Sequence, residues 1–130
     1  MPTILIVDNE PAQRRYVRTI LSEDPSLTFL EAPDEPHALR LAQLHHPDMI
    51  IFDLGGLAPT RSFSREQFQA ARLVRHTPVL FTATWSHTNK TLTTILASGR
   101  PLLFKPFEAA ELLAAVHHAL RRTGLPARMS

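Results

Sequence analysis

Apolar residues follow two different patterns along the chain. Five short runs are almost wholly apolar, and between them lie longer segments in which apolar residues recur every three or four positions. Short continuous runs are typical of strands buried on both faces, and the wider spacing is typical of amphipathic helices. The expected strands cover residues 3–7, 27–30, 49–53, 78–82 and 102–105.

The segments between the strands predict five helices. The first begins near Pro11, which suits a first helical turn, and ends before Asp24 and Pro25. On this helix we expect one apolar side (Tyr16, Val17, Ile20 and Leu21) and one largely basic side (Arg14, Arg15 and Arg18). The other four helices are expected from their apolar residues at 38–44, 68–74, 92–96 and 112–120.

Strands that alternate with helices predict one α/β domain with a parallel sheet and right-handed crossovers. The expected fold is flavodoxin-like: a doubly wound (βα)5 domain whose five strands lie in the order 2-1-3-4-5. We place this domain at residues 1–122 and a C-terminal tail at residues 123–130.

The composition narrows the class of protein. Hydrophobic residues make up 44% of the chain and charged residues 20%, as in ordinary globular proteins. No apolar run is long enough to span a membrane, no signal peptide precedes the first strand, and cysteine is absent, which together fit a cytoplasmic protein. The net charge is only +2 and the arginines are scattered, so we do not expect direct nucleic-acid binding.

Polar residues that could bind a ligand or take part in a reaction stand at the ends of the expected strands. Asp8 follows the first strand, Asp53 ends the third, and Thr82 and Lys105 end the fourth and fifth. In the expected order the first and third strands are neighbours, so both carboxylates would face one crevice. Two carboxylates suit Mg2+, while a lysine and a hydroxyl suit phosphoryl oxygens. Together these groups could transfer a phosphoryl group onto a carboxylate.

Four sequence blocks carry a resemblance to a known family. They are ILIVDNEP at residues 4–11, PDMIIFDL at 47–54, PVLFTA at 78–83 and FKPF at 104–107. In this order and with these separations they resemble the response-regulator receiver domain of two-component (phosphorelay) signal transduction systems. The resemblance spans essentially the whole chain.

The resemblance implies a site and a role for its residues. Asp53 would be the phosphoacceptor that becomes an aspartyl phosphate, and Asp8, Asp53 and the carbonyl group of Gly55 would bind Mg2+. Thr82 and Lys105 would bind the phosphoryl group and couple its presence to a change in the protein surface. The bond before Pro106 is expected to be cis.

The resemblance also implies partners. A sensor histidine kinase or a histidine phosphotransfer protein would supply the phosphoryl group, and an unknown downstream protein would bind the switched surface. A homodimer is left open. The domain would be a signalling switch and not an enzyme.

Several residues depart from the family pattern. Asn9 stands where a second acidic residue is usual, so that residue 9 would offer the metal an amide oxygen in place of a carboxylate. Glu10 could supply the missing charge or act only as a helix-start carboxylate. Gly56 and Leu57 replace a usual Met-Pro, and Leu102 stands where an aromatic switch residue is common.

Two other functions compete with a working receiver. The first is a pseudo-receiver, which has the same fold but binds proteins without being phosphorylated. The second is a phosphohydrolase of the haloacid-dehalogenase type, which would use Asp8 on the first strand, with Glu10 at the place of its second acid. A flavin-binding flavodoxin is disfavoured because the loop after the first strand is acidic and would repel a phosphate.

Two further features, the paired histidines and the single tryptophan, have ordinary structural explanations. His45 and His46, like His117 and His118, are adjacent on helices and point in different directions, so we expect surface histidines and not a metal site. Trp85, three residues after Thr82, is either a core residue or a contact that responds to phosphorylation.

Overall fold

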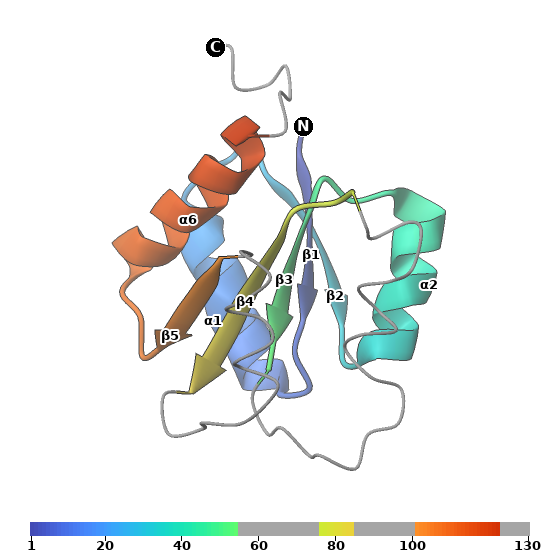
Figure 1. The fold of residues 1–130 in the computed structure, drawn as a ribbon, viewed down its shortest axis with the longest axis horizontal. Helices are drawn as coiled ribbons and strands as arrows, with labels where there is room; N and C mark the ends of the chain where they lie inside the picture. Colours follow the sequence, from blue (N-terminus) through green and yellow to red (C-terminus); the bar gives the residue numbers. More distant parts are fainter. Residues whose placement is uncertain (55–75, 85–100, 123–130) are drawn as a thin grey trace.

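The computed structural model describes residues 1–54, 76–84 and 101–122, which form five strands and three helices (Figure 1). The strands are β1 (Thr3–Val7), β2 (Thr28–Ala32), β3 (Met49–Asp53), β4 (Val79–Thr84) and β5 (Leu102–Lys105). The helices are α1 (Pro11–Leu21), α2 (Glu35–His45) and α6 (Ala109–Arg122). The expected third and fourth helices, Gly55 to Leu57, Trp85 and the expected tail lie outside the described residues.

All five strands are parallel and lie in the order β2-β1-β3-β4-β5, as the sequence predicted. The central strand β3 pairs with β1 on one side and with β4 on the other, so that Asp53 lies opposite Thr82. The arrowheads in Figure 1 all point to one edge of the sheet. The carboxyl ends of the strands therefore meet there, where ligands of open α/β sheets bind.

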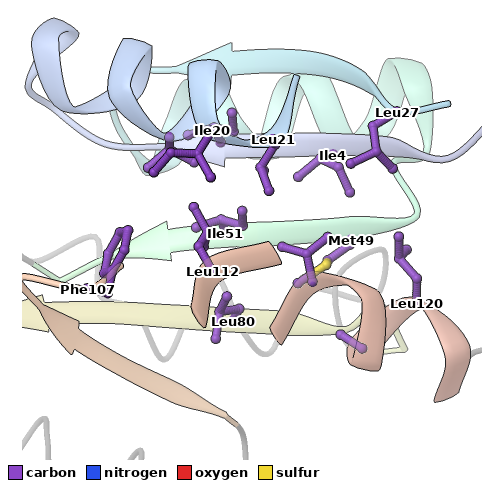
Figure 2. Close-up of a cluster of buried hydrophobic side chains, with 14 residues drawn as sticks. Ile4, Ile20, Leu21, Leu27, Met49, Ile51, Leu80, Phe107, Leu112 and Leu120 are labelled. Carbon is purple, nitrogen blue, oxygen red and sulfur yellow. The ribbon is translucent and has the colours of Figure 1, made fainter. Parts of the chain in front are cut away.

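Side chains alternate between the two faces of the sheet, and each face has its own core. Leu5 and Ile50 belong to a cluster on the side of α2, whereas Ile4, Met49 and Ile51 belong to a cluster on the side of α1 and α6. Figure 2 shows the second cluster, with the labelled side chains of α1, α6 and the sheet pointing toward one another. This alternation explains why the strands read as continuous apolar runs.

Helix α1 begins as the sequence predicted, with Pro11 in its first turn and Glu10 as the N-cap residue. Val17, Ile20 and Leu21 are buried. Tyr16 is an exception to the expected apolar side, because it is 48% exposed and stacks on Phe107 at 6.3 Å between ring centroids. The aromatic ring therefore covers the rim of the core and does not enter it.

Two strand boundaries and one helix face differ from expectation. β2 is shifted toward the C-terminus, so Glu31 and Ala32 lie in the strand, beyond the expected end at residue 30. The amide of Asp8 donates to the carbonyl of Ala32 at 3.0 Å and extends the pairing of β1 with β2. β4 continues past Thr82 to Thr84. Leu44, expected on the apolar face of α2, is 67% exposed, because helical spacing turns it away from the face that buries Ala38 and Ala42.

Two residues after α2 redirect the chain into β3. His46 takes a left-handed conformation with φ of 48° and its amide donates to the carbonyl of Ala42. Pro47, which disfavours a helical residue before it, then ends the helix as predicted. Within the described residues, no helix is both long enough and apolar enough to cross a membrane.

Candidate functional site

The carboxyl edge of the sheet brings together the four side chains that the sequence placed at strand ends. Asp8 directly follows β1, and Asp53 and Lys105 are the last residues of β3 and β5. Thr82 lies within β4, one strand away from Asp53 and in register with it. β1, β3 and β4 are neighbours, and Lys105 reaches back across β4 toward the acids.

Asp53 accepts two short polar contacts on one carboxylate oxygen. The Thr82 hydroxyl donates to Asp53 Oδ1 at 2.7 Å, and Lys105 Nζ lies 2.8 Å from the same atom. The Asp53 side chain is 6% exposed and Thr82 is buried, whereas the Lys105 side chain is 19% exposed. A carboxylate so held has a fixed orientation and loses little freedom when it reacts.

Asp8 is a buried carboxylate beside this group. Its Oδ2 lies 3.7 Å from Lys105 Nζ, and its Oδ1 accepts a hydrogen bond from the Glu10 amide at 2.9 Å. Burial raises the pKa of Asp8 above its usual range, and the negative charge of Asp53 adds to the increase. The Glu10 hydrogen bond and the Lys105 ammonium act in the opposite direction.

The charges of this group favour an added cation. Two carboxylates share one ammonium group, so these three side chains carry a net negative charge when the acids are ionised. Mg2+ prefers one or two carboxylates together with water and phosphate oxygens, and Asp8 and Asp53 could supply such a pair. In the described part of the chain, no three acidic, histidine or cysteine side chains form a metal-binding group. The two carboxylates therefore fit Mg2+, which completes its coordination with water and phosphate oxygens.

The remaining residues implied for the site are placed as follows. Asn9 and Glu10 are exposed between Asp8 and the start of α1, and Gly55 lies outside the described residues. The peptide bond between Lys105 and Pro106 is cis, the isomer that the resemblance implies. Phe107 then enters the core between the sheet and the two helices α1 and α6. Leu102 is half-buried in β5 against the α2-side core.

Sequence reasoning missed an arginine beside the site. Arg14, expected on the solvated side of α1, donates from Nη1 to the backbone carbonyl of Asp8 at 2.6 Å. Its Nε contacts Glu31 Oε1 at 3.2 Å, and Glu31 Oε2 in turn accepts from Arg18 Nη1 at 2.7 Å. Helical spacing could not reveal this chain of contacts, because Glu31 belongs to β2 and lies beyond residue 30, where the expected second strand ended.

One histidine also has a partner that the sequence did not indicate. His117 Nε2 of α6 lies 2.8 Å from Asp24 Oδ2, in the turn between α1 and β2. The pair lines a pocket of about 180 Å³ at the opposite edge of the sheet, together with Leu27, Leu120 and Arg121. It ties two segments together far from the carboxylates and forms no part of the candidate site.

Comparisons of sequence show the family of the chain. The response regulator receiver domain family matches residues 4–117. The KDP operon transcriptional regulatory protein KdpE of Escherichia coli is 34% identical over 127 residues, covering 94% of this chain and 52% of that protein. The nitrate/nitrite response regulator protein NarL of Escherichia coli is 30% identical over 123 residues, covering 90% of this chain and 54% of that protein. The chain thus spans about half the length of these curated relatives.

Comparison of folds leads to the same family. The chemotaxis protein CheY4 of Vibrio cholerae superposes with a TM-score of 0.72 at 25% identity, covering 92% of this chain and 98% of that chain. With the family match over most of its length and the acidic pair, hydroxyl and lysine gathered at the carboxyl edge of its sheet, this chain belongs to the response regulator receiver domain family.

Proposed function

We propose that this domain accepts a phosphoryl group on Asp53 and thereby switches a surface that another protein binds. The observation that carries the proposal is the pair of contacts on Asp53 Oδ1, from the Thr82 hydroxyl and the Lys105 ammonium, beside the buried Asp8. An oriented carboxylate next to a cationic group and a hydroxyl donor is what transfer to an acid requires.

The transfer begins with attack of an Asp53 carboxylate oxygen on phosphorus. A bond from that oxygen to phosphorus forms, while the bond from phosphorus to an imidazole nitrogen of the donor histidine breaks. The nitrogen keeps the electron pair, and the donor leaves as a neutral histidine once a proton is bound. The donor would be a histidine kinase or a histidine phosphotransfer protein.

Each described side chain of the site has a role in this step. Lys105 stabilises the negative charge on the transferred group, because its ammonium already lies 2.8 Å from the acceptor oxygen. Thr82 moves its hydrogen bond from Asp53 to a phosphoryl oxygen. Asp8 and Asp53 would hold Mg2+, and we propose the carbonyl of Gly55 and the side chain of Asn9 as further ligands of the ion. Bound Mg2+ supplies positive charge that offsets the charge of the phosphoryl oxygens.

The switch follows from the contacts that the unphosphorylated Asp53 makes. Thr82 and Lys105 both contact Asp53 Oδ1, and an oxygen bonded to phosphorus can no longer accept them in the same way. If Oδ1 forms the bond, both donors must find new partners among the phosphoryl oxygens, which biases β4 and β5 toward a second state. We place this event in the cytoplasm, on the ground of family membership, and assign the domain to residues 1–122.

The experiment that tests the proposal is incubation with acetyl phosphate and Mg2+, followed by measurement of the intact mass. The wild type should gain one phosphoryl group. Asp53→Asn should gain none and should keep its fold, because the two side chains have nearly the same shape. A modified Asp53→Asn protein would place the acceptor elsewhere.

A pseudo-receiver is the second candidate, and Asn9 is the observation that favours it. An amide at this place brings no charge to a metal that hard anionic oxygens bind best. A wild type that remains unmodified at high donor and Mg2+ concentrations, while retaining its fold, would support this candidate over the first.

A further inference from the structure

Arg14 binds both ends of the loop that carries Asp8. Asp8, Asn9 and Glu10 connect β1 to α1, and the backbone amide of Arg14 donates to the carbonyl of Glu10 at 3.0 Å as the first turn of α1 forms. The side chain of Arg14 folds back over the same loop and donates to the carbonyl of Asp8 at 2.6 Å. Both ends of the loop are thus fixed from a single position on the helix.

The guanidinium of Arg14 is itself held in place. Glu31, in the outer strand β2, accepts hydrogen bonds from Arg14 Nε at 3.2 Å and from Arg18 Nη1 at 2.7 Å. The hydrogen bond from Arg18, with that from Arg14, keeps the pKa of Glu31 below its usual range although burial opposes the change. Glu31 therefore stays ionised at neutral pH. The Arg14 side chain is only 16% exposed, so its orientation is constrained more than that of a surface arginine.

Asp8 has little freedom to compensate if this contact is lost. Its amide is bound to Ala32 and its Oδ1 to the Glu10 amide, so the carbonyl is its third fixed point. A shift of the peptide between Asp8 and Asn9 would displace the Glu10 amide that binds Asp8 Oδ1, and the Asp8 carboxylate would lose the hydrogen bond that orients it. Because residue 9 is an asparagine, the orientation of Asp8 matters more here than in a site with a second acid.

We propose that Arg14 is a positioning residue of the candidate site, holding the Asp8 peptide so that the Asp8 carboxylate faces Asp53 and can bind a divalent cation. The part of this inference that concerns the cation rests on the proposed function. Residues that orient a metal ligand through a hydrogen bond typically raise metal affinity, and their removal weakens binding by about tenfold or more.

A simple charge effect makes the opposite prediction. If Arg14 acted only through its positive charge, removing that charge would strengthen the binding of Mg2+ to the two carboxylates. If Arg14 positions Asp8, Arg14→Met should weaken Mg2+ binding by about tenfold. Arg14→Lys keeps the charge but lacks the forked donors, so it should recover only part of the loss. Arg15→Met, which removes an exposed charge from the neighbouring position, is the matched control and should change little.

The test combines calorimetric titration with Mg2+ and amide hydrogen exchange of the metal-free protein. In Arg14→Met the amide of Glu10, which is bonded to Asp8, should exchange about fivefold faster, the effect of losing roughly one hydrogen bond. The amide of Thr28, bonded to Pro2 away from the site, should be unchanged. Faster exchange at both amides would indicate general loosening and overturn the proposal.

The two readouts also separate this inference from the proposed function. An Mg2+ affinity that is unchanged or higher in Arg14→Met overturns the positioning role. If the wild type does not bind Mg2+, the metal part of the proposed function fails, and the Glu10 amide decides the inference alone. Faster exchange confined to that amide then supports Arg14 as the residue that holds Asp8, and exchange equal to that of the wild type contradicts it.

Discussion

At the scale of single residues, the site depends on a small imbalance of charge. Asp8 and Asp53 are buried near one ammonium group, Lys105, and Asn9 beside them is neutral. A second acid at residue 9 would increase the attraction for a cation but also the repulsion in its absence. The types and places of these residues could be predicted from strand ends alone. Their mutual contacts could not, since the position of the Lys105 ammonium depends on how the side chain crosses β4.

Asn9→Asp tests this balance directly. We expect Mg2+ to bind about tenfold more tightly, which corresponds to roughly 1.4 kcal/mol, because carboxylate oxygens bind hard cations better than an amide oxygen does. The metal-free variant should have a lower free energy of unfolding from repulsion among the acids. Mg2+ should therefore stabilise the variant more than the wild type. Thermal melts across a Mg2+ series provide the measurement.

A matched control adds the same charge elsewhere. Gln43→Glu lies on an exposed position of α2, on the other face of the sheet from α1, and should leave the response to Mg2+ unchanged. If Asn9→Asp and Gln43→Glu respond alike to Mg2+, residue 9 does not face the metal.

At the scale of the elements, periodicity predicted the strands and helices of the described residues and most of the faces that they bury. It was wrong at the end of β2, at the end of β4 and at Leu44 of α2. The apolar runs of β1 and β3 left no ambiguity, because strands buried on both faces are apolar throughout. β2 is an edge strand and carries Glu31, so its end resembled a turn in the sequence. Contacts between elements, such as Arg14 with Glu31 or His117 with Asp24, depend on three-dimensional packing that no local pattern records.

The contact of α6 with the turn before β2 predicts a pH dependence. Hydrogen bonds from Ser26 and then from His117 hold the pKa of Asp24 below its ordinary value of 3.8. A lowered folded pKa means that the stabilisation is complete above the unfolded value and is lost as pH falls through the folded value. Asp24→Asn should therefore lower the free energy of unfolding by about 1 kcal/mol or less at pH 5, as is typical of a partly exposed pair.

The difference between Asp24→Asn and the wild type should shrink as pH falls below about 4, where the wild-type carboxyl also loses its charge. Denaturant unfolding between pH 3 and pH 6 measures it. Glu23→Gln removes an exposed neighbouring charge and controls for a general effect. A difference that stays constant, or grows toward low pH, would contradict the assignment.

At the scale of the whole molecule, the parallel sheet explains why distant residues form one site. Residues 8, 53, 82 and 105 are far apart in sequence, yet the strand order puts them at one edge. The alternation of strands and helices was enough to predict this architecture, and the strand order was taken from the flavodoxin-like type of doubly wound fold. The spacing of strands along the sequence could not decide which of the two carboxylates reacts. The resemblance implies Asp53, and the contacts of Asp53 with Thr82 and Lys105, which only the structure provides, support that proposal.

The proposal that Asp53 is the phosphoacceptor is tested by locating the phosphoryl group in the modified protein. After incubation with acetyl phosphate and Mg2+, reduction with borohydride converts an aspartyl phosphate to homoserine, and peptide mass spectrometry locates the changed residue. We predict homoserine at residue 53 and unchanged aspartate at residue 8. Homoserine at residue 8 would indicate chemistry of the phosphohydrolase type on the first strand, and its absence from both positions in a folded protein would contradict the assignment of Asp53 as the phosphoacceptor.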